Sequence, residues 1–160
     1  MFDLGQTLLA AVAREPDALA VVDGDVQLTY RQWSRQIGAL CKGLSKLGLR
    51  RGDHLAVVLQ NRLEMATLHW ACQFLGVVIT PVNWRATDDE LGYILDDAGA
   101  AAVVFEAVSE AAVAAATASR SLPRIRVGAA SAVSDVVDFA SLLEDGDGTL
   151  SDPVCTPDDT

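Results

Sequence analysis

The chain of 160 residues carries 22 acidic and 12 basic side chains, which gives a formal net charge of −10, and 51% of its residues are hydrophobic. This length and apolar content suffice for one domain with a hydrophobic core. The negative charge argues against nucleic acid and anionic membranes as partners, because both are bound through basic patches.

The sequence shows no signal for export or membrane insertion. No apolar run approaches the roughly 18–20 residues of a membrane span, and the first residues lack the basic region of a secretory signal. The three cysteines, at positions 41, 72 and 155, have neither the spacing of metal ligands nor the even number of a disulfide framework. We therefore expect a reduced, cytoplasmic protein with no membrane span.

The N-terminal part predicts a helix, a hairpin and a second helix. A short amphipathic pattern ends before Pro16, and residues 18–28 then predict a β-hairpin that turns at Asp-Gly-Asp. Thr29 and Gln32 have the spacing of a capping box. The apolar side chains that follow at three- and four-residue intervals predict a helix that Gly48 ends.

The central stretch, residues 52–95, begins as strand and helix. Residues 55–59 form a short valine-rich apolar run, which is typical of a buried strand. Asn61 is a candidate N-cap of the next helix, with Glu64 in the capping-box position. Gly76 can then end that helix.

A second apolar run and further strands complete a repeating pattern. Residues 77–82 predict the next strand, Thr87 and Glu90 can cap a helix, and residues 101–105 and 124–127 predict two more strands around an alanine-rich helix. Strand–helix–strand units with short connections build parallel sheets. We therefore predict an α/β fold, a mainly parallel sheet with helices on both faces, plus a small N-terminal β-hairpin.

The composition changes at residue 128. Residues 128–160 contain no Lys or Arg, and eight acidic residues gather there. Three apolar residues, at positions 139, 142 and 143, indicate one short helix inside this segment. We therefore divide the chain into an α/β subdomain at 1–127 and an acidic, loop-rich connector at 128–160.

The common chemical motifs are missing or incomplete. No Gly-x-Gly-x-x-Gly follows a strand, so a dinucleotide fingerprint is lacking. Residues 145–148 resemble the start of a calcium loop, but position 156 is Thr where a bidentate Glu is needed, which favours a solvated turn. His69 and Cys72 could share one metal ion, but no further ligand is near in sequence, so packed core residues are the better interpretation. The residues alone predict no catalytic and no metal-binding side chain.

Short sequence blocks follow one another along residues 28–105. They are Leu-Thr-Tyr at 28–30, Leu-Gly-Leu at 47–49, Arg-Gly-Asp-His-Leu-Ala-Val at 51–57, Gln-Asn at 60–61, Phe-Leu-Gly-Val-Val at 74–78, Thr-Pro-Val-Asn-Trp-Arg at 80–85 and Asp-Asp-Glu-Leu-Gly-Tyr-Ile-Leu at 88–95. In this order the blocks resemble the N-terminal part of an adenylate-forming, or AMP-binding, enzyme. That family contains acyl-CoA synthetases, luciferases and the adenylation domains of peptide synthetases, and the Asn-Trp-Arg form is most similar to acid–CoA ligases.

The resemblance implies a two-step ligase reaction. A carboxylate attacks the α-phosphate of ATP to give an acyl-adenylate and pyrophosphate, and the thiol of CoA then displaces AMP. In this family the catalytic groups lie on a phosphate loop ending in Pro-Lys-Gly, on later acidic motifs and on a lysine of a C-terminal domain. The sequence contains none of these, so we expect ATP, Mg²⁺ and CoA to serve the full-length enzyme, and this N-terminal third to be inactive and to hold no cofactor alone.

Three hypotheses remain open about the whole protein. It is an acid–CoA ligase of fatty or aromatic acid metabolism, or another adenylate-forming enzyme such as a peptide-synthetase adenylation domain, or a non-catalytic interaction module. The expected partners are a small carboxylic acid and the remainder of the same enzyme. We also expect an exposed apolar patch, with Trp70 and Phe74 as candidates, through which the fragment could self-associate.

Arg85 is the one side chain for which the resemblance implies a direct role. It follows a predicted strand on the side where ligands gather in open α/β sheets, and it precedes a helix start whose N–H groups attract anions. By resemblance to CoA ligases, its guanidinium lies near the nucleotide end of CoA, where it suits a phosphate. The alternative is that Arg85 pairs with Asp88 or Asp89 and braces the turn.

Overall fold

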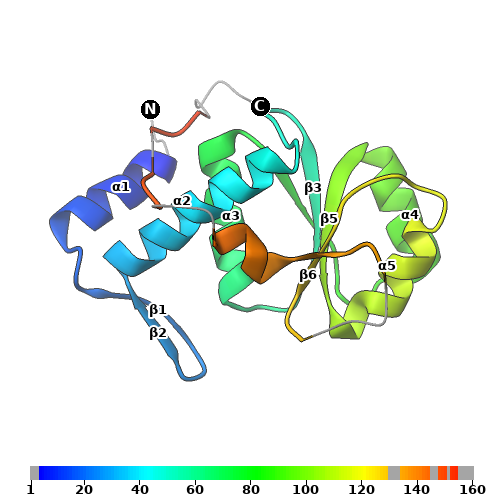
Figure 1. The fold of residues 1–160 in the computed structure, drawn as a ribbon, viewed down its shortest axis with the longest axis horizontal. Helices are drawn as coiled ribbons and strands as arrows, with labels where there is room; N and C mark the ends of the chain where they lie inside the picture. The colour runs from blue at the N-terminus through cyan, green and yellow to red at the C-terminus, as the bar shows by residue number, and fades with distance from the viewer. Residues whose placement is uncertain (1–3, 130–133, 145–147, 151, 155–160) are drawn as a thin grey trace.

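The computed structural model of the protein describes residues 4–129, 134–144, 148–150 and 152–154. They form a five-stranded sheet with helices on both faces and a two-stranded antiparallel hairpin near the N-terminus (Figure 1). In chain order the elements are α1 (Leu4–Arg14), β1 (Leu19–Asp23), β2 (Val26–Thr29), α2 (Tyr30–Lys46), β3 (His54–Val58), α3 (Leu63–Leu75), β4 (Val78–Pro81), α4 (Asp88–Asp97), β5 (Ala100–Glu106), the 3₁₀ helix η1 (Ala107–Ser109), α5 (Glu110–Thr117), β6 (Arg124–Val127), β7 (Val137–Asp138) and the 3₁₀ helix η2 (Phe139–Leu143).

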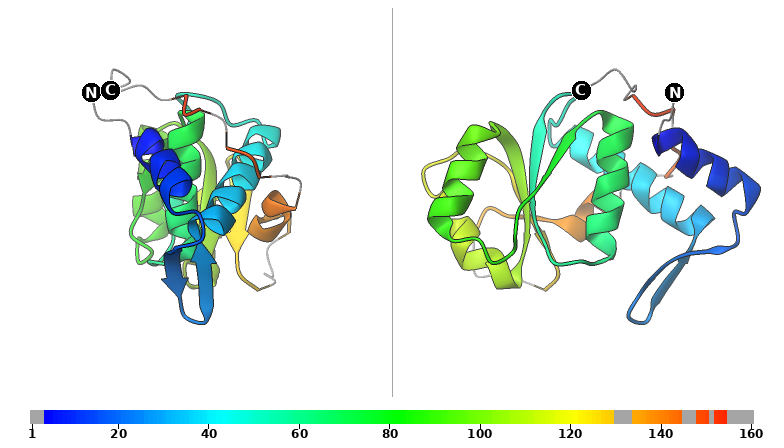
Figure 2. Two further views of the ribbon diagram at one scale, coloured as in Figure 1. Left: turned by 90° about the vertical axis from the view of Figure 1, so that its left-hand side faces the viewer. Right: turned by 180° about the vertical axis from the view of Figure 1, so that it is seen from behind.

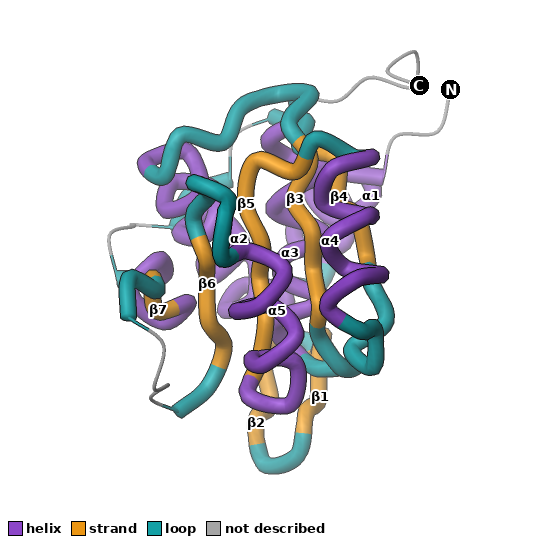
Figure 3. Tube along the Cα trace, turned by 90° about the vertical axis from the view of Figure 1, so that its right-hand side faces the viewer, coloured by secondary structure: helices purple, strands orange, loops and turns teal. Residues whose placement is uncertain are grey.

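The five strands are parallel and lie in the order β4-β3-β5-β6-β7. In this doubly wound order the chain passes from β3 to β4 and then returns to the other side of β3. Helices α2 and α3 pack together on one face of the sheet, and α4 and α5 pack together on the opposite face (Figures 2 and 3). The predicted α/β fold, with its parallel sheet and its N-terminal hairpin, is therefore confirmed.

The central strand β3 is buried on both faces. Leu55 and Val57 belong to the hydrophobic cluster under α2 and α3, whereas Ala56 and Val58 belong to the cluster under α4 and α5. None of these four residues is more than 1% exposed. Burial on both faces explains why this strand reads as an uninterrupted apolar run rather than an alternating one.

Strand β4 forms one edge of the sheet, and a proline interrupts its free side. The amides of Val78 and Val82 donate towards β3, to the carbonyls of Asp53 at 2.8 Å and Val57 at 2.9 Å. Since amides alternate in direction along a strand, those of residues 79 and 81 face away from β3. Residue 81 is proline, which has no N–H, so this edge offers one outward donor, at Ile79.

Two of the three predicted capping boxes are present. At α2 the Thr29 hydroxyl accepts from the Gln32 amide while the Gln32 side chain accepts from the Thr29 amide. Thr87 and Glu90 make the same reciprocal pair at the start of α4. Both boxes were predictable because each joins residues only three positions apart.

The predicted cap of α3 by Asn61 is wrong. The N-cap residue is Arg62, and its side chain makes no capping hydrogen bond. Instead the carboxylate of Asp23, at the end of β1, accepts from the amide of Leu63 at 2.7 Å. Glu64 accepts from the Arg62 guanidinium, so it is not available for a capping box. The hairpin therefore caps a helix 40 residues further along the chain.

The predicted place of Phe74 in an exposed apolar patch is also wrong. Phe74 is only 3% exposed and lies in the core. Trp70 is half-buried and packs edge-on against Trp33, with ring centroids 6.4 Å apart. A helix that is apolar nearly all round is covered on several sides, here by α1 and α2. The self-association of the fragment stays a prediction, without Phe74 as part of its basis.

Part of the segment predicted as a connector packs into the α/β unit. Strand β7 pairs in parallel with β6, and Phe139 and Leu142 of η2 are buried in the core beside α2. The short helix expected around residues 139–143 is present as η2. The division after residue 127 stays a prediction.

The weak metal motifs gain no support from the described residues. Cys72 is fully buried, and the His69 ring packs against Trp70 at a centroid distance of 5.6 Å. No group of three potential metal ligands gathers in the described ranges. Of the calcium-loop resemblance at residues 145–148, residues 145–147 lie outside them. None of the helices in the described part of the chain has the length and hydropathy of a membrane span.

Candidate functional site

The carboxyl ends of the parallel strands meet at one edge of the sheet, where open α/β sheets bind ligands. Strand β3 ends at Val58, β4 ends at Pro81 and β5 ends at Glu106. Two polar arrangements lie at this edge. One is the turn after β4 that carries Arg85, and the other lies between the ends of β3 and β5.

The turn after β4 presents Arg85 on an aromatic platform. The carbonyl of Asn83 accepts from the amide of Ala86 at 2.9 Å, and the side-chain oxygen of Asn83 accepts from the amide of Arg85 at 3.0 Å. The guanidinium of Arg85 lies over the ring of Trp84, 4.1 Å from the ring centre. Because a stacked guanidinium keeps its N–H groups at its rim, Arg85 can still donate to an anion.

The alternative role of Arg85 as a brace finds no contact to support it. Among the described residues, no ion pair joins Arg85 to Asp88 or Asp89. Arg85 is exposed and, with Asn83, Asp89 and Tyr93, lines a hollow of about 770 Å³. Trp84, rather than a carboxylate, therefore orients the guanidinium.

The start of α4 attracts an anion less than the sequence analysis predicted from the N–H groups of a helix start. Three acidic residues, Asp88, Asp89 and Glu90, occupy its first turn. The pKa of Glu90 lies below its usual value because its carboxylate accepts from the Thr87 amide and hydroxyl. These charges stabilise the helix start but repel a phosphate, so an anion would reach Arg85 from the side of Trp84 and Asn83.

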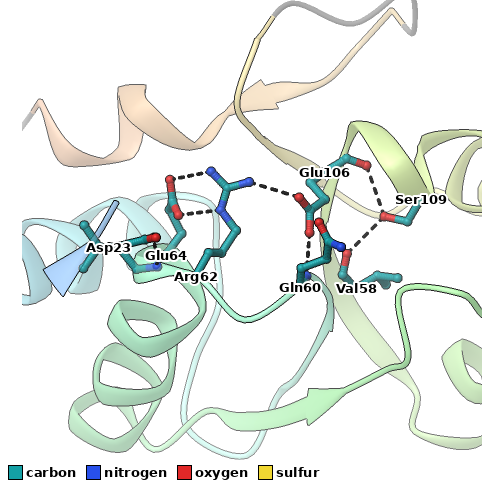
Figure 4. Close-up of polar contacts among 8 residues, drawn as sticks. Asp23, Val58, Gln60, Arg62, Glu64, Glu106 and Ser109 are labelled. Carbon is teal, nitrogen blue, oxygen red and sulfur yellow. Dashed lines mark hydrogen bonds and ion pairs between the residues drawn. The ribbon is translucent and has the colours of Figure 1, made fainter. Parts of the chain in front are cut away.

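The second arrangement lies at the carboxyl ends of β3 and β5 (Figure 4). Glu106 ends β5 and is 8% exposed. One of its oxygens accepts from the amide of Gln60, and the other accepts from Nη1 of Arg62 at 3.1 Å. Ser109 donates to the carbonyls of Val58 at 3.0 Å and Glu106 at 3.1 Å. These contacts join the loop after β3 to the end of β5.

Arg62 also holds a second carboxylate. Its Nε and Nη2 donate to the two oxygens of Glu64 at 2.6 and 3.1 Å. The pKa of Arg62 is raised, first by the hydrogen bonds to Glu64 and further by Glu106, so the guanidinium stays charged. One sign of this network is visible in the sequence, the charged Glu106 directly after an apolar run, but the sequence analysis did not identify it.

Two known proteins that are similar to this chain are named as a CoA synthase and a CoA ligase. A feruloyl-CoA synthase of an Amycolatopsis species is 33% identical over 132 residues, which are 82% of this chain and 27% of that protein. The long-chain-fatty-acid–CoA ligase FadD13 of Mycobacterium tuberculosis is 31% identical over 111 residues, which are 68% of this chain and 22% of the ligase. This chain thus spans less than a third of the length of either relative.

A solved structure shows the same fold in one such enzyme. The fatty acyl CoA synthetase of Mycobacterium tuberculosis superposes with a TM-score of 0.83 at 26% identity, over 98% of this chain and 31% of the synthetase. The model of the AMP-binding enzyme family matches residues 8–160, which is nearly the whole sequence. The resemblance found in the sequence blocks is confirmed, and the chain belongs to the family of AMP-binding enzymes.

Proposed function

We propose that this chain is the N-terminal part of an ATP-dependent carboxylic acid–CoA ligase. The whole enzyme joins a carboxylate to AMP with release of pyrophosphate, and then transfers the acyl group to the thiol of CoA with release of AMP. The names of the feruloyl-CoA synthase and of FadD13 favour CoA over a carrier-protein thiol as acceptor. They also support both a fatty and an aromatic acid as the substrate class.

The position of Arg85 supports a role for this residue in binding CoA. Its side chain is exposed, its guanidinium is stacked on Trp84, and the residue lines a hollow at the carboxyl edge of the sheet. We assign to it a contact with a phosphate of CoA, because a planar guanidinium donates paired hydrogen bonds to phosphate oxygens. Arg85 binds and orients the acceptor in this role and does not touch the reacting atoms.

In contrast to CoA, neither ATP nor Mg²⁺ finds a matching group of residues in the described part of this chain. The sequence contains no Pro-Lys-Gly phosphate loop, and the described residues bring no three metal ligands together. When bound, Mg²⁺ neutralises phosphate charge in adenylate formation. We assign its site and that of ATP to the remainder of the enzyme. Cys41 and Cys72 do not form a disulfide with each other, which agrees with the cytoplasmic location that belongs to this proposal.

The test is the kinetics of Arg85→Ala in the full-length enzyme. We expect the KM for CoA to rise while the adenylation half-reaction, measured by ATP–pyrophosphate exchange, keeps its rate. Losing one charged hydrogen-bonding partner costs about 1–3 kcal/mol, which corresponds to a rise of about 5- to 150-fold in KM.

Two matched variants make the result specific. Arg14→Ala removes an equal charge from α1, where the side chain is 73% exposed beside Glu15, and should leave the KM for CoA unchanged. Arg85→Lys keeps the charge but loses the planar stack on Trp84, so its KM should lie between those of wild type and Arg85→Ala. If the CoA kinetics of Arg85→Ala match those of wild type and only thermal stability falls, Arg85 is a structural residue.

A further inference from the structure

The crevice between β3 and β5 is the place where a doubly wound sheet ordinarily receives a ligand. The chain leaves β3 towards α3 on one face and leaves β5 towards α5 on the other, so the two loops diverge (Figure 3). Loops that diverge in this way open a crevice at the carboxyl ends of the two strands. In this protein the side chain of Glu106 lies at that position, between the loop after β3 and the end of β5 (Figure 4).

The groups that donate hydrogen bonds to Glu106 are of the kinds that bind a carboxylate ligand in proteins. A backbone amide, that of Gln60, donates to one oxygen, and the Arg62 guanidinium donates to the other at 3.1 Å. Both donors come from the loop after β3, whereas the carboxylate comes from β5, 44 residues beyond Arg62. A fixed amide together with a guanidinium forms strong, oriented hydrogen bonds to an anion.

Arg62 does not need Glu106 for neutralisation. Glu64 already accepts from Arg62 through both of its oxygens. The Glu106 side chain is 10% exposed, which is less than the 24% of Glu64. Burying a second carboxylate beside a guanidinium that is already paired is costly unless every oxygen finds a donor. Both oxygens of Glu106 do, so the crevice is built to receive a carboxylate.

We propose that this crevice is a carboxylate-binding site which the chain occupies with its own Glu106. Glu106 acts as an internal ligand that closes the crevice and ties the loop after β3 to the end of β5. A free monocarboxylate of the size of formate or acetate would replace it if its side chain were removed. The proposal uses no property of Arg85, so it stands or falls separately from the assigned CoA contact.

Because Glu106 occupies this site, it also affects where an anion from solution can bind. With the gap closed by Glu106, an exposed cation that lines a hollow at this edge of the described structure is Arg85, after the neighbouring strand β4. An anion that binds at this edge would therefore meet Arg85, from the side of Trp84 and Asn83 and away from the acidic start of α4, rather than the gap between β3 and β5.

The experiment is anion rescue of Glu106→Ala in the 160-residue chain. Thermal unfolding is followed by circular dichroism in sodium formate and in sodium chloride at equal ionic strength. Glu106→Ala should be less stable than wild type in chloride and should recover stability in formate in a saturable way. At a formate concentration ten times the dissociation constant, the ratio of folded to unfolded chains should rise about 11-fold.

Two controls define the site. Glu106→Gln fills the same volume and leaves no space, so its response to formate should equal that of wild type. Benzoate is too large for the space left by one side chain and should not rescue Glu106→Ala. In ¹⁵N-labelled Glu106→Ala, the amide resonance of Gln60 should shift with the same half-saturation as the stability gain.

If Glu106→Ala does not fold in chloride, recovery of the native spectrum on refolding in formate, with none in chloride, supports the proposal. An equal formate effect in wild type, Glu106→Gln and Glu106→Ala overturns it, as does the absence of any recovery. A stability gain without movement of the Gln60 amide places formate elsewhere and also overturns it.

Discussion

Replacing Gly43 by alanine tests how closely η2 packs on helix α2. A Cβ atom at this position would lie 2.6 Å from the carbonyl oxygen of Leu142 and 2.8 Å from its Cβ. These neighbours include backbone, so a side-chain rotation cannot relieve the clash, and η2 must shift away. Leu142 is 6% exposed and Phe139 of the same element is 4% exposed, and both would be partly uncovered.

Gly92 in α4 provides the matched control. A Cβ atom there would meet only the Arg120 guanidinium, at 3.6 Å, which is an ordinary contact. Alanine is preferred over glycine inside a helix by about 0.5–1 kcal/mol, and this gain applies to both positions. The difference between the two variants therefore isolates the steric term, and overpacking of a core typically costs about 1–3 kcal/mol.

Urea unfolding followed by circular dichroism measures both variants against wild type. Gly92→Ala should unfold at a higher urea concentration, Gly43→Ala at a lower one, and the slopes of the transitions should be equal. If Gly43→Ala is as stable as Gly92→Ala, then η2 does not press on α2 as described, and the contact of the acidic segment with the core is wrong.

Two further predictions concern pH and nucleotide. Arg120 donates to both oxygens of Asp96, at 2.9 and 2.7 Å, and these hydrogen bonds hold the pKa of that carboxyl below its usual value. The stabilisation of the fold by this pair is therefore present at neutral pH and is lost as the pH falls through the folded-state pKa. The difference in Tm between wild type and Asp96→Asn should therefore be constant above about pH 5 and shrink as the pH falls below about 4, and a difference that stays constant at low pH would contradict the pairing. Residues 1–160 alone should show neither ATP–pyrophosphate exchange nor saturable ATP binding in calorimetry, because a net charge of −10 repels a triphosphate on average. Tight ATP binding would place the nucleotide site in this part of the enzyme.

The features that the sequence predicted correctly depend on residues close together in the chain. The capping boxes at Thr29 and Thr87 each span three residues, and the buried strand β3 is one short apolar run. The parallel sheet followed from repetition of such units. Arg85 and Trp84 are adjacent, so an aromatic partner for the guanidinium could have been expected from the sequence as well.

The features that it missed join distant residues. Asn61 has the right chemistry for a cap, but Asp23 reaches the Leu63 amide from a hairpin 40 residues earlier. Glu106 meets Arg62 across 44 residues, and only the strand order brings the two together. Phe74 was expected at the surface because the periodicity of α3 does not show that α1 and α2 cover two of its sides. Tertiary partners decide these positions, and short-range patterns do not contain them.

The proline at the end of β4 limits what this edge of the sheet can do. An exposed strand edge ordinarily serves as a template on which another chain adds a strand through a row of amide and carbonyl groups. A second molecule approaching β4 would find the outward amide of Ile79 and no donor at Pro81, which is too little for a continuous ladder. The edge therefore resists edge-to-edge aggregation without any charged residue along its four positions.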